Sequence, residues 1–289
     1  MTMINGIYAA TLSILDSDLG LDIKKTILHA EKVINQGCHG AVFFGSTGQS
    51  QLISLSDKIN LINNLSSNSY KEKFIIGTGL NSLSDTISLM KISMSVGFSK
   101  FLIMPPAYYN YGDEEVFNFY SNIIKVNPDS KIILYNFEKL SGYKFSENIV
   151  YKLVESFPNQ IIGVKDSSYN LFEKLKIDNF SLMPGSELKL LKGLDLGCSG
   201  IITATTNATA SLARNVYENF INKKQQNLNK KLCEVREVFE QYNLISGLHT
   251  FFGQNDKNYE NILPPLRILN ETEKNNLFNQ LDTLDFKNN

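Results

Sequence analysis

Two residues that could act together on a ketone stand at the ends of separate apolar runs. Lys165 closes the run in IIGVKDSS, and Tyr135 closes the run in KIILYN upstream. A lysine amine beside a phenol suits imine formation, because the amine attacks a carbonyl carbon and the phenol can move protons. The apolar flank of Ile161, Ile162 and Val164 is expected to desolvate the amine and lower its pKa, which leaves part of it neutral near pH 7. The alternative is that Lys165 only ends a strand and reaches out to water.

These runs belong to a series of short apolar segments that are typical of buried strands. The segments are 6–14, 40–45, 73–79, 100–106, 131–136, 161–167, 180–186 and 199–206. Stretches with helical spacing lie between them, such as Ile23, Ile27, Ala30 and Ile34. Eight strands, each followed by a helix, favour a closed (β/α)8 or TIM barrel, with an open doubly wound sheet as the alternative.

The end of the chain has a different pattern. From about Gln225 onward no strand pattern occurs, and 227–245 and 271–284 are predicted to be helices. We therefore expect a barrel over residues 1–224 that carries the active site. A C-terminal helical extension over 225–289 would pack on it within a single domain.

Composition narrows the classes of function. The net charge of -1 gives no general attraction to nucleic acid or to anionic membranes, and no apolar stretch is long enough to span a bilayer. The N-terminus lacks the pattern of a signal peptide, and three cysteines are spaced far apart, so we expect a soluble protein of the cytoplasm. Only three of the basic residues are arginines, and Arg214, Arg236 and Arg267 are all expected away from the strand ends.

In a TIM barrel the side chains at the carboxyl ends of all strands meet at one mouth. The polar candidates there are Ser46, Thr47, Tyr108, Tyr109, Tyr135, Lys165, Gly185, Ser186, Glu187, Thr203 and Thr205. No histidine, cysteine or acidic pair joins them, which argues against a metal site or a histidine-based triad. The turn GSTGQS at 45–50 could cap the next helix or hold a carboxylate with its hydroxyl and amide groups.

Six motifs together carry a family resemblance. They are GSTGQS at 45–50, GTGLNS at 77–82, PPAYYN at 105–110, YN at 135–136, GVKDSS at 163–168 and GIITATTN at 200–207. In order and spacing they resemble the dihydrodipicolinate synthase and N-acetylneuraminate lyase family. The resemblance implies a class I, Schiff-base aldolase or lyase on a TIM barrel, commonly a homotetramer built as a dimer of dimers. It implies pyruvate or a 2-keto acid plus an aldehyde as substrates, and neither a metal nor another cofactor.

The resemblance also assigns roles at the reacting centre. Lys165 matches the imine-forming lysine, and Tyr135 matches the phenol that shuttles protons. Ser46 and Thr47 match the pair that holds the pyruvate carboxylate, and Ser46 joins the proton relay. Tyr109 matches a tyrosine that in many members reaches into the site of a neighbouring subunit.

Four further residues bear on the substrate. Ile202 and Gly185 match positions that line the pyruvate pocket. Leu140 stands where the synthases carry an arginine for the carboxylate of aspartate semialdehyde. Glu187 is the one acid near strand seven that could bind a polyol, whereas the sialic acid lyases have a tyrosine and two acids there.

These departures favour a 2-keto-3-deoxy or 4-hydroxy-2-keto acid as the substrate. One alternative is a true 4-hydroxy-tetrahydrodipicolinate synthase of lysine biosynthesis, in which Lys139 or Lys144 would replace the missing arginine. Others are an N-acetylneuraminate lyase, a dehydratase or decarboxylating relative, and a noncatalytic 2-keto acid-binding relative.

Overall fold

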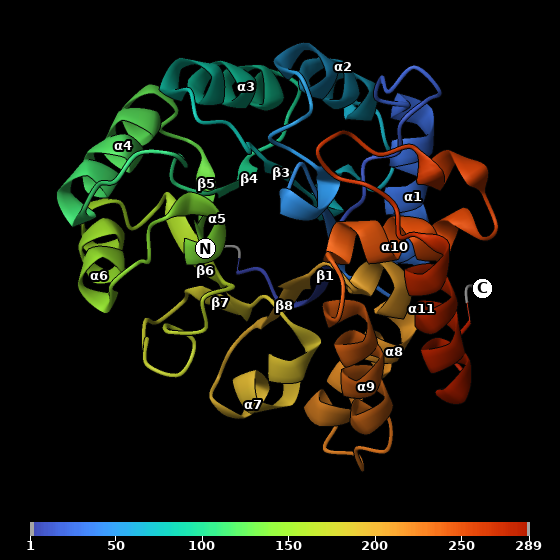
Figure 1. The fold of residues 1–289 in the computed structure, drawn as a ribbon. Coiled ribbons are helices and arrows are strands. Elements are labelled where there is room, and N and C mark those ends of the chain that lie inside the picture. The colour runs from blue at the N-terminus through green and yellow to red at the C-terminus, as the bar shows by residue number, and fades with distance from the viewer. Residues whose placement is uncertain (1–2, 288–289) are drawn as a thin grey trace.

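The computed structural model describes residues 3–287, and its centre is a barrel of eight parallel strands (Figure 1). The strands are β1 (Gly6–Ala10), β2 (Gly40–Phe43), β3 (Phe74–Gly77), β4 (Lys100–Ile103), β5 (Lys131–Asn136), β6 (Ile161–Asp166), β7 (Ser181–Pro184) and β8 (Gly200–Thr203). Consecutive strands pair from β1 to β7, and β8 pairs with β1. The Ser199 amide, next to β8, donates to the Leu182 carbonyl of β7 at 2.9 Å. This closure confirms the predicted TIM barrel, and the alternative of an open sheet is wrong.

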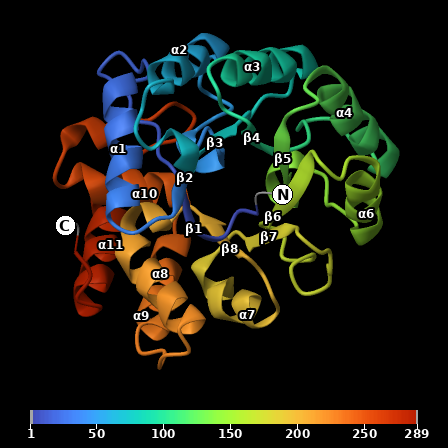
Figure 2. The ribbon, with the colours of Figure 1, turned by 180° about the vertical axis from the view of Figure 1, so that it is seen from behind.

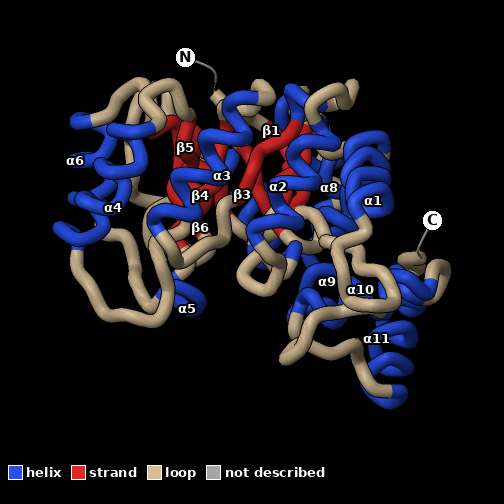
Figure 3. Tube along the Cα trace, turned by 90° about the horizontal axis from the view of Figure 1, so that it is seen from above, coloured by secondary structure: helices blue, strands red, loops and turns tan. Residues whose placement is uncertain are grey.

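Helices surround the strands in both views along the barrel (Figures 1 and 2). They are α1 (Ile23–Asn35), α2 (Leu55–Leu65), α3 (Leu83–Ser95), α4 (Asp113–Val126), α6 (Glu147–Ser156), α7 (Leu190–Asp195) and α8 (Thr206–Ile221). The short helix α5 (Glu138–Ser141) lies instead at one end of the barrel (Figure 3). Asp22 caps α1 by accepting a hydrogen bond from the Lys25 amide, and Ser82 caps α3 in the same way. None of the helices among residues 3–287 combines the length and the apolar character that crossing a membrane requires.

The segment after β6 departs from the expected alternation. Residues 167–180, all of which the structure describes, contain turns and no helix. Asp166 explains this, because its buried carboxylate accepts hydrogen bonds from the amides of Tyr169, Leu171 and Phe172 at 2.8 to 2.9 Å. Those amides are therefore held by a side chain in place of a helical ladder.

The barrel strands divide their side chains between two layers. Residues such as Ile7 and Ala9 of β1 face the helices and join the large core cluster. Their alternate neighbours face the barrel axis in a second cluster, which includes Ala10, Ile133, Tyr135 and Ile202. Tyr135 is thus directed inward by the period of two that every strand imposes.

The C-terminal extension contains α9 (Asn229–Glu240), α10 (Leu244–Gly253) and α11 (Glu271–Thr283), and the boundary expected at residues 224–225 falls between α8 and α9. The single helix predicted over 227–245 is wrong, because α9 ends at Glu240 and Asn243 caps a separate α10. Residues 246–253 of α10 are all buried, so this helix has no polar face to mark it in the sequence. Figure 3 shows the extension at the same end of the barrel as α5, which follows the carboxyl end of β5.

Two buried histidines and a glutamine join the extension to the barrel. His29 of α1 bonds to Tyr259 at 2.8 Å and to Asn207 of α8 at 2.7 Å. His249 of α10 lies with its Nε2 atom 3.5 Å from Gln49 Nε2 on the barrel side, and it donates to the Tyr259 carbonyl within the extension at 2.7 Å. Desolvation lowers the pKa of both histidines to about 4. Gln49, which follows the 46–48 turn after β2, accepts a hydrogen bond from the Leu263 amide at 2.8 Å. The extension therefore contacts the loop that carries Ser46 and Thr47.

Candidate active site

Lys165 and Tyr135 lie side by side on neighbouring strands. They are register partners across β5 and β6, and Lys165 is only 3% exposed. The Lys165 Nζ atom lies 4.1 Å from the centre of the Tyr135 ring, and the Tyr135 hydroxyl shares a 3.0 Å hydrogen bond with Ser46 Oγ. The amine is therefore buried against an aromatic face, and the alternative in which Lys165 reaches out to water is wrong.

Ser46 and Thr47 project from a short 3-10 turn, Ser46–Gly48, directly beyond β2. The next helix, α2, begins at Leu55 and is capped by Ser54, so the interpretation of GSTGQS as a helix cap is wrong. A hydrogen bond from the segment after β1 holds this turn in place, since Ser13 Oγ donates to the Gly48 carbonyl at 2.7 Å. Its hydroxyls are thus held at the mouth of the barrel.

A cavity of about 630 Å³ opens at this mouth. At its base it exposes Ser46, Thr47, Tyr135, Lys165 and Gly185. Its outer walls come from α5 and the residue before it, from the loops after β6 and β8, and from the end of α9 with the start of α10. The residues there are Phe137, Glu138, Lys139, Leu140, Ser167, Ser168, Tyr169, Ala204, Arg236, Glu240, Tyr242, Asn243, Leu244 and Ile245. This volume is within the range of about 300 to 1,000 Å³ that is typical of small-molecule sites, and it leaves room beyond a three-carbon acid.

The remaining candidates from the sequence lie elsewhere. Ile202 is fully buried in the inner barrel cluster, and Glu187 is fully buried beside β8; neither lines the cavity. Tyr109 is 74% exposed after β4 and does not reach the cavity of its own chain. Across residues 3–287, no three histidine, cysteine or acidic side chains come close enough to hold a metal ion.

Asp166, the neighbour of Lys165, holds the outer wall of the cavity in place. Besides its three backbone donors, it accepts a hydrogen bond from the Asn136 amide group at 2.8 Å. This network fixes the turn that carries Ser167, Ser168 and Tyr169 along the cavity. The sequence contained one signal for it, an acid between a strand and a run of turn-forming residues.

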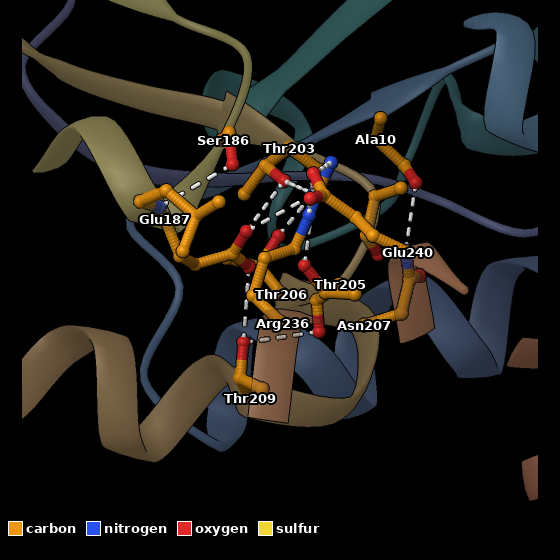
Figure 4. Close-up of polar contacts among 12 residues, drawn as sticks. Ala10, Ser186, Glu187, Thr203, Thr205, Thr206, Asn207, Thr209, Arg236 and Glu240 are labelled. Atoms are coloured by element: carbon orange, nitrogen blue, oxygen red, sulfur yellow. Dashed lines mark hydrogen bonds and ion pairs between the residues drawn. The ribbon is translucent and has the colours of Figure 1, made fainter. Parts of the chain in front are cut away.

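Arg236 corrects the expectation that no arginine lies near a strand end. It belongs to α9, yet its side chain is only 5% exposed and reaches the carboxyl end of β8 (Figure 4). Its Nη1 atom donates to Thr203 Oγ1 at 2.8 Å, to Thr205 Oγ1 at 3.1 Å and to Glu187 Oε2 at 3.2 Å. Its spacing from Leu232 and Phe239 places it on the apolar face of α9, which was the available signal for burial.

Glu187 is the buried counter-ion in this cluster. Its Oε2 atom also accepts a hydrogen bond from Thr203 at 2.9 Å, and its Oε1 atom accepts one from Thr209 at 3.2 Å. Burial alone would lower the pKa of Arg236, but the carboxylates of Glu187 and Glu240 outweigh that effect and raise it. Arg236 therefore stays charged, and Glu187 serves to neutralise it.

Breaking this pair should destabilise the fold, because a charge would be left buried and unpaired. We expect Arg236→Met to lower the free energy of unfolding by about 3 to 5 kcal/mol. Replacing both partners, with Glu187→Gln and Arg236→Met together, should recover much of that loss. Urea unfolding measures the change.

The matched control is Arg214→Met, which removes a half-exposed pair with Glu218 on α8. This substitution should lower the free energy of unfolding by less than about 1 kcal/mol. Equal losses for Arg214→Met and Arg236→Met would contradict the assigned role of the buried pair.

Comparisons with known proteins agree with this architecture. The model of the dihydrodipicolinate synthetase family matches residues 3–284. A 4-hydroxy-tetrahydrodipicolinate synthase of Karelsulcia muelleri is 28% identical over 85% of this chain and 83% of its own. A 2-dehydro-3-deoxy-D-gluconate/2-dehydro-3-deoxy-phosphogluconate aldolase of Picrophilus torridus is 30% identical over 64% of this chain and 69% of its own.

Solved structures show the same fold. YagE from E. coli K12, a prophage protein of the dihydrodipicolinic acid synthase family in complex with pyruvate, superimposes with a TM-score of 0.87. It is 21% identical, and the match covers 99% of this chain and 100% of YagE. The match to the family model spans nearly the whole chain, so the protein belongs to the dihydrodipicolinate synthetase family and is a lyase of that family.

Proposed function

We propose that this lyase is a pyruvate-dependent class I aldolase that forms a Schiff base through Lys165. The observation that carries the proposal is the buried Lys165 amine on the face of Tyr135, whose hydroxyl bonds to Ser46 at the base of the cavity. The nucleophile Lys165, the proton carrier Tyr135 and the second hydroxyl, that of Ser46, are thus neighbours at one site.

The chemistry follows from these positions. The neutral Lys165 amine attacks the keto carbon of the 2-keto acid and forms a carbinolamine. Tyr135 and Ser46 move a proton to the departing hydroxyl, which leaves as water and produces the iminium ion. The iminium withdraws electrons from the adjacent C3 carbon. In cleavage, the C3–C4 bond breaks as Tyr135 takes the C4 hydroxyl proton, which yields an aldehyde and an enamine; in synthesis the enamine attacks the aldehyde.

The turn after β2 is the proposed site for the substrate carboxylate. Ser46 and Thr47 present hydroxyls there, and the turn also offers backbone amides near the base of the cavity. Gly185 borders the same space, and a side chain at this position would collide with Ser167. Ile202 would support the pocket from the barrel interior.

The outer cavity favours a 2-keto-3-deoxy or 4-hydroxy-2-keto acid with an uncharged chain. Leu140 of α5 lines it and is 43% exposed, so this wall has an apolar side chain where a carboxylate would need a cation. Glu187 would act only indirectly, through Arg236. The second candidate is a 4-hydroxy-tetrahydrodipicolinate synthase, which is favoured by Lys139, an exposed cation on the same wall.

Tyr109 is proposed to complete the proton relay from a second copy of the chain. Tyr108 and Tyr109 pack edge to face at 5.1 Å in a loop where Tyr108 adopts a φ of 91°. A second cavity of about 320 Å³ lies beside Ser46 and Tyr135 and is lined by apolar residues that include Phe44, Leu102 and Met104. A tyrosine from a partner could enter it and reach Ser46. This arrangement fits a homotetramer built as a dimer of dimers.

Incubation with pyruvate and borohydride should leave one reduced three-carbon adduct on Lys165, because reduction makes the imine permanent. Mass spectrometry of the digested protein locates it. Lys165→Ala should lose both the adduct and turnover. Lys58→Met is the control, since Lys58 is also buried and desolvation lowers its pKa to about 7, yet it lines neither cavity. An adduct on Lys58, or on no lysine, would reject the mechanism.

Leu140 should make the enzyme prefer glyceraldehyde to aspartate semialdehyde at saturating pyruvate, because the semialdehyde carboxylate lacks a fixed cation. A charge-assisted pair contributes about 1.5 to 3 kcal/mol, or roughly 10- to 150-fold in affinity. Leu140→Arg should shift the kcat/KM ratio toward the semialdehyde. A wild-type preference for the semialdehyde would instead favour the synthase.

Tyr109→Phe and Tyr135→Phe should each lower turnover by about 10²-fold, because each removes a proton carrier. If Tyr109 acts across subunits, mixed oligomers of Tyr109→Phe and Lys165→Ala protomers should have a turnover well above that of either parent variant. Native mass spectrometry reports the oligomeric state and the presence of hybrids. Hybrids that form without regaining activity would count against the shared site.

A further inference from the structure

The end of α9 supplies a charged wall to the cavity. Arg236 and Glu240 both line it, although they belong to the C-terminal extension. Glu240 lies one helical turn after Arg236, and its side chain is 38% exposed. An extension helix thus contributes a carboxylate to the outer part of the site, away from the Lys165 amine at the base.

Arg236 orients this carboxylate. Its Nε atom donates to Glu240 Oε1 at 2.8 Å, and its Nη2 atom lies 2.7 Å from the same oxygen. Both contacts use Oε1, so the second oxygen of Glu240 remains able to accept a hydrogen bond. The cluster of Arg236, Glu187 and Glu240 combines one cation with two carboxylates and carries one net negative charge.

The other charged side chains around the cavity offset the net negative charge of this cluster only weakly. Glu138 on α5 is paired with Lys144 at 3.0 Å, and both side chains are about half exposed. Lys139 is exposed on the same helix, where solvent screens its charge. Glu240 is also exposed, but its two contacts with the buried Arg236 hold its carboxylate in place.

We propose that Glu240 determines specificity by accepting a hydrogen bond from a hydroxyl of the aldehyde portion and by repelling an anionic group there. The inference rests on the proposed aldolase function and names its substrate class, an aldehyde with a neutral, hydroxylated chain. Arg236 is a positioning residue whose charge is already balanced within the protein.

The test compares glyceraldehyde with glyceraldehyde 3-phosphate, which differ only in the phosphate, at saturating pyruvate. Wild type should prefer glyceraldehyde. Glu240→Gln should raise the ratio of kcat/KM for the phosphorylated over the neutral aldehyde on the order of tenfold, the size expected for one charge near a protein surface. The borohydride adduct with pyruvate should be unchanged.

Two further variants test whether the effect comes from the negative charge of Glu240 at this position. Glu240→Asp keeps the carboxylate while weakening its contact with Arg236, and it should keep the wild-type ratio. Glu237→Gln is the matched control, because Glu237 is an exposed acid on the same helix outside the cavity. It should leave both aldehydes unaffected.

The outcomes are distinguishable. Equal ratios in wild type and Glu240→Gln, or the same shift in Glu240→Asp, would overturn the inference while the Lys165 adduct left the aldolase function intact. A wild-type preference for the phosphorylated aldehyde would also overturn it, since Glu240 would then not repel an anionic group. Absence of the pyruvate adduct from wild type would reject the aldolase function and the inference with it.

Discussion

The site depends on one contact, the packing of the Lys165 amine over the ring of Tyr135 across β5 and β6. A lysine that is almost fully buried needs partners, and here the aromatic face of Tyr135 provides one. The same register directs the phenol hydroxyl toward Ser46. Because neighbouring parallel strands hold the two residues, their relative position is determined by the ladder of the barrel.

The loops around this contact are fixed by buried polar groups. Asp166 accepts hydrogen bonds from three backbone amides and one side-chain amide. These bonds form an ordered turn where a helix was expected after β6. Gln49 joins the turn after β2 to the extension. Each group satisfies backbone amides that would otherwise lack partners, so hydrogen bonds to buried side chains hold these loops in place.

The extension shares in building the site. Its helix α9 inserts Arg236 between Glu187 and Glu240, and this pairing brings a C-terminal segment to the carboxyl ends of β7 and β8. Buried ion pairs contribute little net stability but strongly penalise the loss of one partner. Such a pair therefore specifies how α9 sits on the barrel, and with it the electrostatic character of the outer cavity.

The sequence by itself determined the barrel, since short apolar runs alternating with helical periods leave few other packings, and it singled out Lys165 and Tyr135 at strand ends. It also marked the turn with Ser46 and Thr47, because strand ends in a barrel share one mouth. Only the tertiary structure decided the places of Arg236, Glu240 and Glu187. Their contacts join residues 187, 203 and 236 across long separations, and local patterns carry no information on which buried charges will meet. The sequence also did not show α10 as a separate helix. Residues 246–253 are all buried, so this helix has no polar face and no amphipathic pattern that would mark it.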